Sequence, residues 1–323
     1  MKRRILLATP ALLLPLAARA QAAYPDHSIR FVIPWTPGGT NDIVGRVVSD
    51  AMSRRLGQTL ICENRGGAGG ALGAEVVAKA APDGYTVLLS GSGSLVINQI
   101  VRRGHLPYDP TTALTAVGMM GLAPNVLVAH PSVRATTMLE LQALARASRT
   151  PLTYGSSGVG STSHAAGAMI AQALGVEMQH VPYRGSAPAV NDVIAGRLNL
   201  MANAAAPMLP HIRAGTVRAI AIAGHDRAPT TPEVPTMAEQ GFPQVEAATW
   251  YAMHVTGGTP PDRVAKLHAM LNESLAEPDV RRVLADVGLN IAPSESPAAF
   301  ARYVEEDTRR WEPVVRDVGV TAD

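Results

Sequence analysis

Cysteine is almost absent from this sequence, in which Cys62 is the only one. A single thiol can form neither an intrachain disulfide nor a cysteine-rich metal site, so no such cross-link can stabilise the fold. Cys62 lies in the apolar stretch TLICEN, where a small buried side chain is the expected role. The nine histidines are scattered and form no His-Glu-x-x-His motif. We therefore expect neither a zinc site nor another bound cofactor.

Lysine is also scarce, and beyond residue 20 it occurs only at Lys79 and Lys266. Four of the 28 basic residues lie in the first 20 positions, which hold none of the 26 acidic residues, so the remainder carries a net charge of about −2. A nucleic-acid interface requires clustered lysine and arginine. We therefore expect no nucleic acid among the partners.

The familiar catalytic motifs are missing as well. No Gly-x-Gly-x-x-Gly follows the first predicted strand, no Gly-Lys pair forms a P-loop, and no Gly-x-Ser-x-Gly nucleophile elbow occurs. A periplasmic serine hydrolase that uses a serine of YGSSGVGSTSH (154–164) is the alternative, enzymatic interpretation. Ser161 and His164 alone are too few for that chemistry, because a serine nucleophile needs a base that a third group orients. These absences favour a binding protein over an enzyme.

The amino-terminal residues have the three-part pattern of a secretory signal. Basic residues at positions 2–4 precede an apolar run from residue 5 to about 18, and a small-residue cleavage motif ends at Ala20. A membrane anchor is the alternative, but the run is shorter than the ~20 residues that a spanning helix needs, and two prolines interrupt it. The sequence therefore predicts a signal peptide over 1–20, cleaved after Ala20 or Ala22, and a periplasmic protein.

The remaining chain of about 300 residues exceeds the size at which one hydrophobic core usually divides, so two domains are expected. From Ser28 onward, short β-branched runs alternate with helical patterns, and glycine or proline marks the joints. This alternation is typical of an α/β fold with a parallel sheet. The first half predicts strands at 28–34, 59–64 and 85–91, with helices at about 42–56 and 70–80.

The alternation of strand and helix patterns starts again after the segment LPYDP, which predicts a second sheet. Two apolar stretches, 117–131 and 248–258, are interpreted as strands that cross a hinge between the halves. The helical tail, roughly 260–318, would then return to the first domain. Two consecutive, unlinked domains are the alternative. The second half predicts strands at 152–156, 178–183, 198–204 and 217–224, with helices near 161–174, 186–196 and 206–214.

Two glycine-rich segments, 34–42 and 154–164, stand at the start of a predicted helix directly after a strand. The first N–H groups of a helix lack internal partners, and its dipole places partial positive charge there, so such ends favour anions. Ordinary turns with helix caps are the alternative for either segment alone. Because there is one in each half, the two would face each other across a cleft at the carboxyl ends of the strands.

Six segments of the chain together match the pattern of a known family. The chain resembles the Bug-type substrate-binding proteins of tripartite tricarboxylate transporters, over essentially its whole mature length. The matching segments are YPDHSIRFVIPWTPGGTNDIVGR, ENRGGAGGALGAEVVAKAAPDGYTVLLSG, LPYDP, LTYGSSGVGSTSHAAGAMI, HVPYRGSAPAVNDVIAGRLNL and PEVPTMAEQGF.

The resemblance implies an α/β fold of the two-lobed periplasmic binding protein type, a type II-like Venus flytrap with two hinge-crossing strands. Its domain boundaries would be 24–122 plus 252–323 for domain 1, and 123–251 for domain 2. It implies a monomeric receptor that performs no chemistry, needs no cofactor and captures a small carboxylate. The partner would be a tripartite tricarboxylate-type transporter or, for a sensory role, a membrane kinase.

In this family, main-chain groups and hydroxyls of the two facing loops hold the carboxylate, often through bridging waters, rather than an arginine clamp. In the first domain, the resemblance assigns ligand binding to Thr36, Gly39, Thr40, Asp42, Ser90, Gly91 and Asn98. In the second domain, it assigns ligand binding to Ser156, Ser157, Gly158, Ser161, Thr162, His164, Tyr183 and Arg184. For His164, a buried, hydrogen-bonded side chain is the alternative role.

Three positions depart from the family pattern. Trp35 stands where phenylalanine is usual, Gln99 follows Asn98 where proline is usual, and Asn199 replaces a common aspartate. Because Trp35 borders the expected site, we expect a narrower or more aromatic pocket. The ligand of a relative therefore cannot simply be transferred to this chain.

Overall fold

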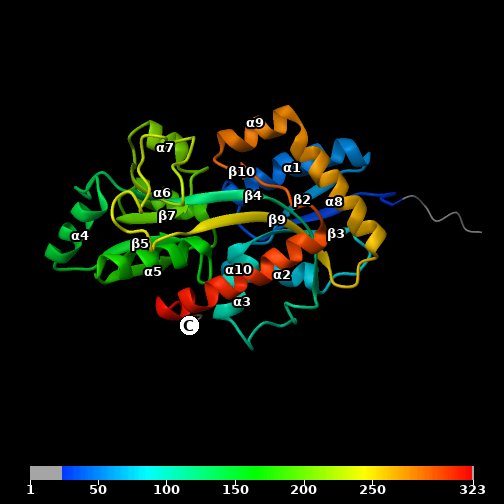
Figure 1. The fold of residues 1–323 in the computed structure, drawn as a ribbon, viewed down its shortest axis with the longest axis horizontal. Coiled ribbons are helices and arrows are strands. Elements are labelled where there is room, and N and C mark those ends of the chain that lie inside the picture. The colour runs from blue at the N-terminus through cyan, green and yellow to red at the C-terminus, as the bar shows by residue number, and fades with distance from the viewer. Residues whose placement is uncertain (1–23, 322–323) are drawn as a thin grey trace, which may run out of the picture.

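Residues 24–321 are described by a computed structural model, and they form two α/β lobes that lie side by side (Figure 1). The predicted signal peptide lies outside the described residues. Within them, no helix is both long and apolar enough to span a bilayer. The first lobe begins with β1 (Ile29–Ile33), α1 (Thr40–Leu56), β2 (Leu60–Asn64), α2 (Ala71–Ala78), β3 (Thr86–Gly91) and α3 (Asn98–Val101).

The second lobe follows the same alternation of strands and helices, and it starts beyond the middle of β4 (Leu114–Ala129). Its elements are α4 (Met138–Ala147), β5 (Leu152–Ser156), α5 (Thr162–Leu174), β6 (Met178–Pro182), α6 (Ser186–Ile194), β7 (Leu200–Ala204), α7 (Leu209–Arg213) and β8 (Arg218–Ala223). The chain then returns through β9 (Ala248–Thr256) to α8 (Pro261–Ala276), α9 (Pro278–Asp286), β10 (Asn290–Ile291) and α10 (Pro297–Asp317).

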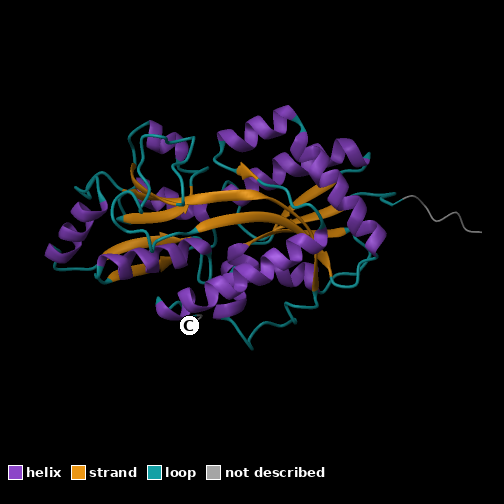
Figure 2. Cartoon of the chain, in the orientation of Figure 1, coloured by secondary structure: helices purple, strands orange, loops and turns teal. Residues whose placement is uncertain are grey.

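One sheet of ten strands runs through both lobes, in the order β2-β1-β3-β9-β4-β7-β5-β6, and β8 and β10 also pair with β4 (Figure 2). The first part of β4, Leu114–Pro124, pairs with β9. The last part, Asn125–Ala129, pairs with β7 and β8. β4 therefore belongs to both lobes, and β9 runs beside it up to the junction. This confirms the two predicted crossing strands.

Helices cover both faces of the first-lobe sheet, with α1, α8 and α9 on one side and α2, α3 and α10 on the other (Figure 1). Strands enclosed in this way must be apolar on both faces. In β1, four of five residues are buried, and Leu88 and Leu89 of β3 are both fully buried. The continuous apolar runs in the sequence therefore correctly predicted strands that are buried on both faces.

The carboxyl-terminal helix α10 contacts both lobes. Trp250 of β9 donates an indole hydrogen bond to Asp307 of α10 at 2.8 Å, and Asp307 also accepts from Arg310 at 2.8 Å. At its far end, the Gln172 side chain of α5 donates to the carbonyl oxygen of Asp317 at 3.2 Å. Since Trp250 is only 1% exposed, α10 is tied to the crossing strand and touches the second lobe as well.

Several features of the fold were not predicted from the sequence. Helices α3 and α4, the latter capped by Thr137, lie in stretches for which the sequence predicts no element. The helical tail is divided into α8, α9 and α10, and a short strand, β10, precedes α10. The division has a local cause, because Pro278 begins α9 and Pro297 begins α10, and proline favours the first turn of a helix over its interior.

We predict that Asp307→Ala lowers the free energy of unfolding by about 1–3 kcal/mol, because it leaves the buried Trp250 N–H without an acceptor. Urea denaturation measures this loss. The matched control is Asp50→Ala, which removes an exposed carboxylate that pairs with Arg54 within α1. That control should change the free energy of unfolding by at most about 0.5 kcal/mol. Equal losses in both variants would show that the Trp250–Asp307 bond contributes nothing.

Candidate functional site

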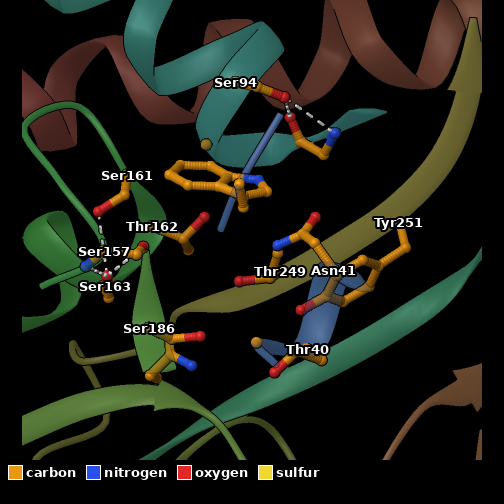
Figure 3. A pocket seen from close by; sticks show the side chains of 15 residues that line it. Thr40, Asn41, Ser94, Ser157, Ser161, Thr162, Ser163, Ser186, Thr249 and Tyr251 are labelled. Atoms are coloured by element: carbon orange, nitrogen blue, oxygen red, sulfur yellow. Dashed lines mark hydrogen bonds between the residues drawn. The ribbon is translucent and has the colours of Figure 1, made fainter. Parts of the chain in front are cut away.

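A pocket lies between the lobes, at the carboxyl ends of the parallel strands of both. Its walls come from the turns after β1, β3, β5 and β6, and from β7 and β9. Figure 3 shows its side chains, which are almost all hydroxyls and amides. The lining residues are Trp35, Gly39, Thr40, Asn41, Gly91, Gly93, Ser94, Ser157, Ser161, Thr162, Ser163, Ser186, Asn203, Thr249 and Tyr251.

The pocket is nearly filled by its own walls. Its free volume is about 20 Å³, which is roughly the space that one water molecule requires. The lobes also touch directly around it, where the Ser92 and Thr162 hydroxyls lie 3.2 Å apart. The structure is therefore a closed form, and a ligand larger than water needs the lobes to separate before it binds.

Three helices begin at this pocket. Gly39 is the N-cap of α1, Ser161 is the N-cap of α5, and Gly185 precedes the first residue of α6, Ser186. Their free N–H groups and dipoles place partial positive charge around one small volume. The α1 and α5 ends correspond to the two glycine-rich segments of the sequence. The α6 end was not recognised, although Arg184-Gly185-Ser186 is the same kind of turn after a strand.

Ser163 is the centre of a hydroxyl network on the second-lobe wall (Figure 3). Its hydroxyl lies 2.9 Å from the hydroxyl of Ser157 and 3.0 Å from that of Ser161, and it accepts from the Ser157 N–H at 2.9 Å. The Ser161 hydroxyl donates to the Gly158 carbonyl at 2.6 Å. These bonds hold the hydroxyls of Ser157 and Ser161 in place before any ligand arrives.

The crossing strand β9 supplies part of the opposite wall. Thr249 and Tyr251 line the pocket, while Trp250 between them points away to α10. Alternate residues of a strand share a face, so the hinge and the pocket use the same segment. The stretch 248–258 was predicted only as a hinge strand, although its period-two pattern already places alternate side chains on one face. Six further lining residues were not predicted, namely Asn41, Gly93, Ser94, Ser163, Ser186 and Asn203.

The structure brings together six of the residues that the resemblance assigned to ligand binding. These are Gly39, Thr40, Gly91, Ser157, Ser161 and Thr162. Three further residues lie close to the junction of the lobes but face each other rather than the pocket. Asn98 donates to the carbonyl oxygens of Ala68 in the first lobe, at 2.7 Å, and of Val159 in the second, at 3.4 Å. Gly158 lies against Gly69, and the buried Thr36 hydroxyl lies against Gly185.

Asp42, another assigned residue, lies behind the first-lobe loop instead of in the pocket. Its carboxylate accepts from the Gly38 N–H at 3.1 Å, from Asn64 at 2.9 Å and from Arg46 at 3.0 Å. Burial raises the pKa of Asp42, but the hydrogen bonds from Arg46, Asn64 and Gly38 outweigh it, and the pKa is lowered. Asp42 is therefore an ionised group that fixes the shape of the Gly38–Gly39 turn.

Four more assigned residues lie outside the pocket lining. The Ser90 hydroxyl bonds Nδ1 of His254 at 2.7 Å, and Tyr183 donates to Asp192. Arg184 is exposed and lines a groove at the outer edge of the junction together with Arg102. Ser156 is fully buried and lies below the pocket, where its hydroxyl is 2.6 Å from Nε2 of His180.

His164 and His180 form a stacked pair beneath the second-lobe loop, with ring centroids 3.7 Å apart and an interplanar angle of 8°. Nδ1 of His164 accepts from the Gly160 N–H at 3.4 Å. Burial lowers the pKa of His180 from 6.5 to about 4. Burial and the neighbouring His180 lower the pKa of His164 to about 3. Both rings are therefore neutral near pH 7 and support the loop from below.

The Ser156–His180 contact does not make a hydrolytic site. Ser156 has no exposed surface, and its hydroxyl accepts from the Gly158 N–H at 3.1 Å. Among the described residues, no carboxylate bonds the other ring nitrogen of His180, so the base lacks the third group that would orient it. Residues 24–321 also contain no cluster of three His, Cys, Asp or Glu side chains that could hold a metal ion.

Comparisons with known proteins agree with this geometry. The model of the tripartite tricarboxylate transporter family receptor, TctC, matches residues 44–320. A UPF0065 protein in the tcbD-tcbE intergenic region of Pseudomonas sp. (strain P51) is 35% identical, over 100% of this chain and 96% of its own length. Protein BugT of Bordetella pertussis is 33% identical, over 98% of this chain and 95% of its own length.

Solved structures show the same fold at similar identity. Rpa4515 of R. palustris, solved with adipate, is 33% identical with a TM-score of 0.88, over 92% of this chain and 99% of that one. MatC of Rhodopseudomonas palustris, solved with bound malate, is 32% identical with a TM-score of 0.85, over 90% of this chain and 100% of that one. The periplasmic binding protein BugD is 31% identical with a TM-score of 0.87, over 92% of this chain and 99% of that one.

We predict that acidification destabilises the protein through the His164–His180 pair. The unfolded chain binds protons at these histidines below about pH 6.5, whereas the folded chain resists protonation until about pH 3–4, so stability falls as the pH falls through this window. His180→Gln should reduce the slope of unfolding free energy against pH between 6.5 and 4, measured by urea denaturation. The buried His254, whose pKa burial lowers to about 3, retains part of the slope.

The control for this experiment is His225→Gln, which removes a histidine whose side chain is 86% exposed and lies outside the pair. This variant should show the same slope of unfolding free energy against pH as the wild-type protein. If His180→Gln and His225→Gln gave the same slope as the wild type, the stacked pair would have no part in the acid response.

Proposed function

The chain belongs to the tripartite tricarboxylate transporter family of receptors, and on that premise we propose that it binds a small carboxylate in the pocket between its lobes. The observation that carries this proposal is the meeting of three helix amino ends and a set of fixed hydroxyls around one volume, with no charged side chain among the lining residues. Its relatives Rpa4515 and MatC, solved with adipate and malate, support the same class of ligand.

Neutral donors are sufficient to bind such a ligand. Each hydrogen bond to a charged group supplies about 1.5–3 kcal/mol, so three or four of them offset the cost of association and give roughly micromolar affinity. We assign direct contacts to Gly39, Thr40, Ser157, Ser161 and Thr162. Gly91 also lines the pocket, and the remaining assigned residues act from outside it. Asp42, Ser156 and His164 support the two loops, while Thr36, Asn98, Gly158, Tyr183 and Arg184 lie at the junction of the lobes.

We place the boundaries of the lobes at 24–122 plus 252–323 for domain 1 and at 123–251 for domain 2. The change of partners in β4 between Pro124 and Asn125 supports the first crossing point. The start of β9 at Ala248, opposite Pro124, supports a second crossing point close to residue 251. Opening would then bend both strands at one level of the sheet.

The cellular role follows from the family. Its solved members are periplasmic binding proteins, which supports a periplasmic location for this chain, reached through cleavage of the signal at 1–20. We propose that the chain acts as a monomer, performs no reaction on its ligand, and delivers it to transporter subunits. Recognition of the loaded form by a sensor kinase is the second role that the same closure would serve.

We predict that small carboxylates raise the melting temperature, since only the folded protein binds them. Thr162→Val removes a pocket hydroxyl at nearly constant volume and should weaken binding about tenfold. Isothermal titration calorimetry measures the dissociation constant. The matched control is the exposed Thr150→Val, which should bind as the wild type does. If a panel of mono- and dicarboxylates, amino acids and aromatic acids caused no thermal shift, the proposal would fail.

The closed form itself depends on Gly185. A Cβ atom at this position would lie 2.1 Å from the Thr36 hydroxyl of the other lobe. The backbone of Gly185 is extended, with φ 162° and ψ 173°, so any residue could adopt its φ within an isolated lobe. Glycine is therefore required here by contact between the lobes and not by the fold of either lobe.

We predict that Gly185→Ala prevents full closure and increases the radius of gyration at saturating ligand, measured by small-angle X-ray scattering. Affinity should fall about tenfold or more, because pocket contacts from one lobe are lost. Thr36→Ala removes the obstructing hydroxyl, so the double variant should close again. If the Gly185→Ala protein closed as tightly as the wild type without the second change, the predicted contact would be contradicted.

A further inference from the structure

A second hollow, separate from the ligand pocket, lies at the outer edge of the junction between the lobes. The first lobe lines this junction groove with Ala68, Gly69 and Arg102, and the second lobe lines it with the turns around Gly158 and Arg184. It shares no lining residue with the ligand pocket. Its volume is about 580 Å³, against about 20 Å³ for the pocket. The junction groove is therefore open to a partner while the protein is closed.

Contact between the lobes forms the junction groove. A Cβ atom at Gly69 of the first lobe would lie 2.0 Å from the carbonyl oxygen of Val159 of the second, and one at Gly158 would lie 3.3 Å from the Gly69 backbone nitrogen. Asn98 donates to the carbonyl oxygens of both Ala68 and Val159. The lining residues from the two lobes thus touch each other. Separation of the lobes would divide the junction groove into two halves.

Two arginines, one from each lobe, give the junction groove a positive charge. The Arg102 N–H donates to the Asn98 carbonyl at 2.9 Å, and Arg184 precedes Gly185, which lies against Thr36 of the first lobe. Both arginines therefore stand next to contacts that closure makes. Neither forms an ion pair with a carboxylate of residues 24–321, and no acidic residue lines the junction groove. The Nε atom of Arg102 is also buried without a hydrogen-bond partner.

The chemistry of the junction groove fits an acidic protein segment. Unpaired arginines attract carboxylates. A small free anion fits less well, because Arg184 is exposed and an exposed ion pair contributes little by itself. Apolar surface lies beside the arginines at Val159, Pro182 and Pro188, and Leu72, which is 49% exposed, follows the same glycine-rich loop as Gly69. Arginine beside apolar side chains is typical of protein interfaces.

We propose that the junction groove is the docking surface for an acidic segment of the protein partner to which the receptor reports. The inference rests on the proposed function, since it assumes that a bound carboxylate holds the lobes closed. It adds the place and the charge of the contact. Carboxylates of the partner can pair with Arg102 and Arg184 together only when closure brings the two arginines to one groove. The partner therefore binds the loaded receptor more tightly than the open one.

Two peptides that differ only in charge test the inference. The acidic probe is acetyl-Asp-Leu-Glu-Asp-Leu-Glu-amide, and the neutral probe, acetyl-Asn-Leu-Gln-Asn-Leu-Gln-amide, replaces each acid by its amide. Each peptide carries a fluorescent label, and anisotropy gives its dissociation constant for the full mature protein, saturated with an acid that raises the melting temperature. The acidic peptide should bind at least about fivefold more tightly than the neutral one.

Three variants locate the binding site of the acidic peptide. Arg102→Gln and Arg184→Gln each remove one charge from the junction groove and should weaken binding at least about fivefold. The matched control is Arg213→Gln, which removes an exposed arginine of α7 and changes the net charge equally. It should bind the peptide as the wild type does. Circular dichroism and the melting temperature establish that the variants are folded.

The dependence on closure is tested with Gly185→Ala, which keeps both arginines. Where scattering shows this variant to be open, the acidic peptide should bind at least about fivefold more weakly than it binds the loaded wild type. The double variant with Thr36→Ala should recover both closure and peptide binding. Equal binding by the open variant and the loaded wild type would overturn the inference, because the junction groove would then not report closure.

The remaining results separate the inference from the proposed function. Equal affinity for the two peptides, or an equal loss in Arg213→Gln and the two groove variants, would overturn the inference while carboxylate binding stood. If citrate bound as tightly as the acidic peptide and Arg184→Gln weakened it, a small anion would be the occupant and the inference would be wrong. If no acid raised the melting temperature, the proposed function would fail, and the peptides would then be compared on the ligand-free wild type and Gly185→Ala.

Discussion

Contact between the two lobes at the starts of three helices is the interaction on which the site depends. The amino ends of α1, α5 and α6 provide positive potential without a lysine or arginine in the pocket. This positive potential comes from backbone groups of both lobes. All three helix ends therefore surround the pocket only when the lobes are closed. Binding and closure are therefore one event, because an anion that holds the first-lobe end to the second-lobe ends gains all of its bonds in the closed form.

The sheet explains how the lobes can move without disrupting either core. β4 changes partners at Asn125, so each lobe keeps its own pairing while one strand passes through both. In β9, Thr249 and Tyr251 face the pocket and Trp250 faces Asp307 of α10. A bend of β9 at these residues would therefore move the pocket wall and the contact with α10 at the same time. Since α10 also touches α5 through Gln172, opening must strain or release that contact.

The sequence was sufficient for most of the strand and helix order, because periodicity and glycine-proline joints are local signals, although α3, α4 and β10 were not predicted. It was also sufficient for two of the three helix ends, since Gly38-Gly39 and the serines at 156–161 follow obvious strands. Local signals could not show that Asp42 turns back to Arg46 and Asn64, that Ser156 points below the pocket to His180, or that Asn203 lines the pocket. Those positions depend on contacts between distant segments, which the pattern of one segment does not contain.

The closed form also shows why neutral groups suit this kind of receptor. A charged residue in a pocket of about 20 Å³ would lose its hydration without gaining a partner whenever the empty protein closed. Hydroxyls can bond one another instead, as Ser157, Ser161 and Ser163 do, so the empty site loses little on closing.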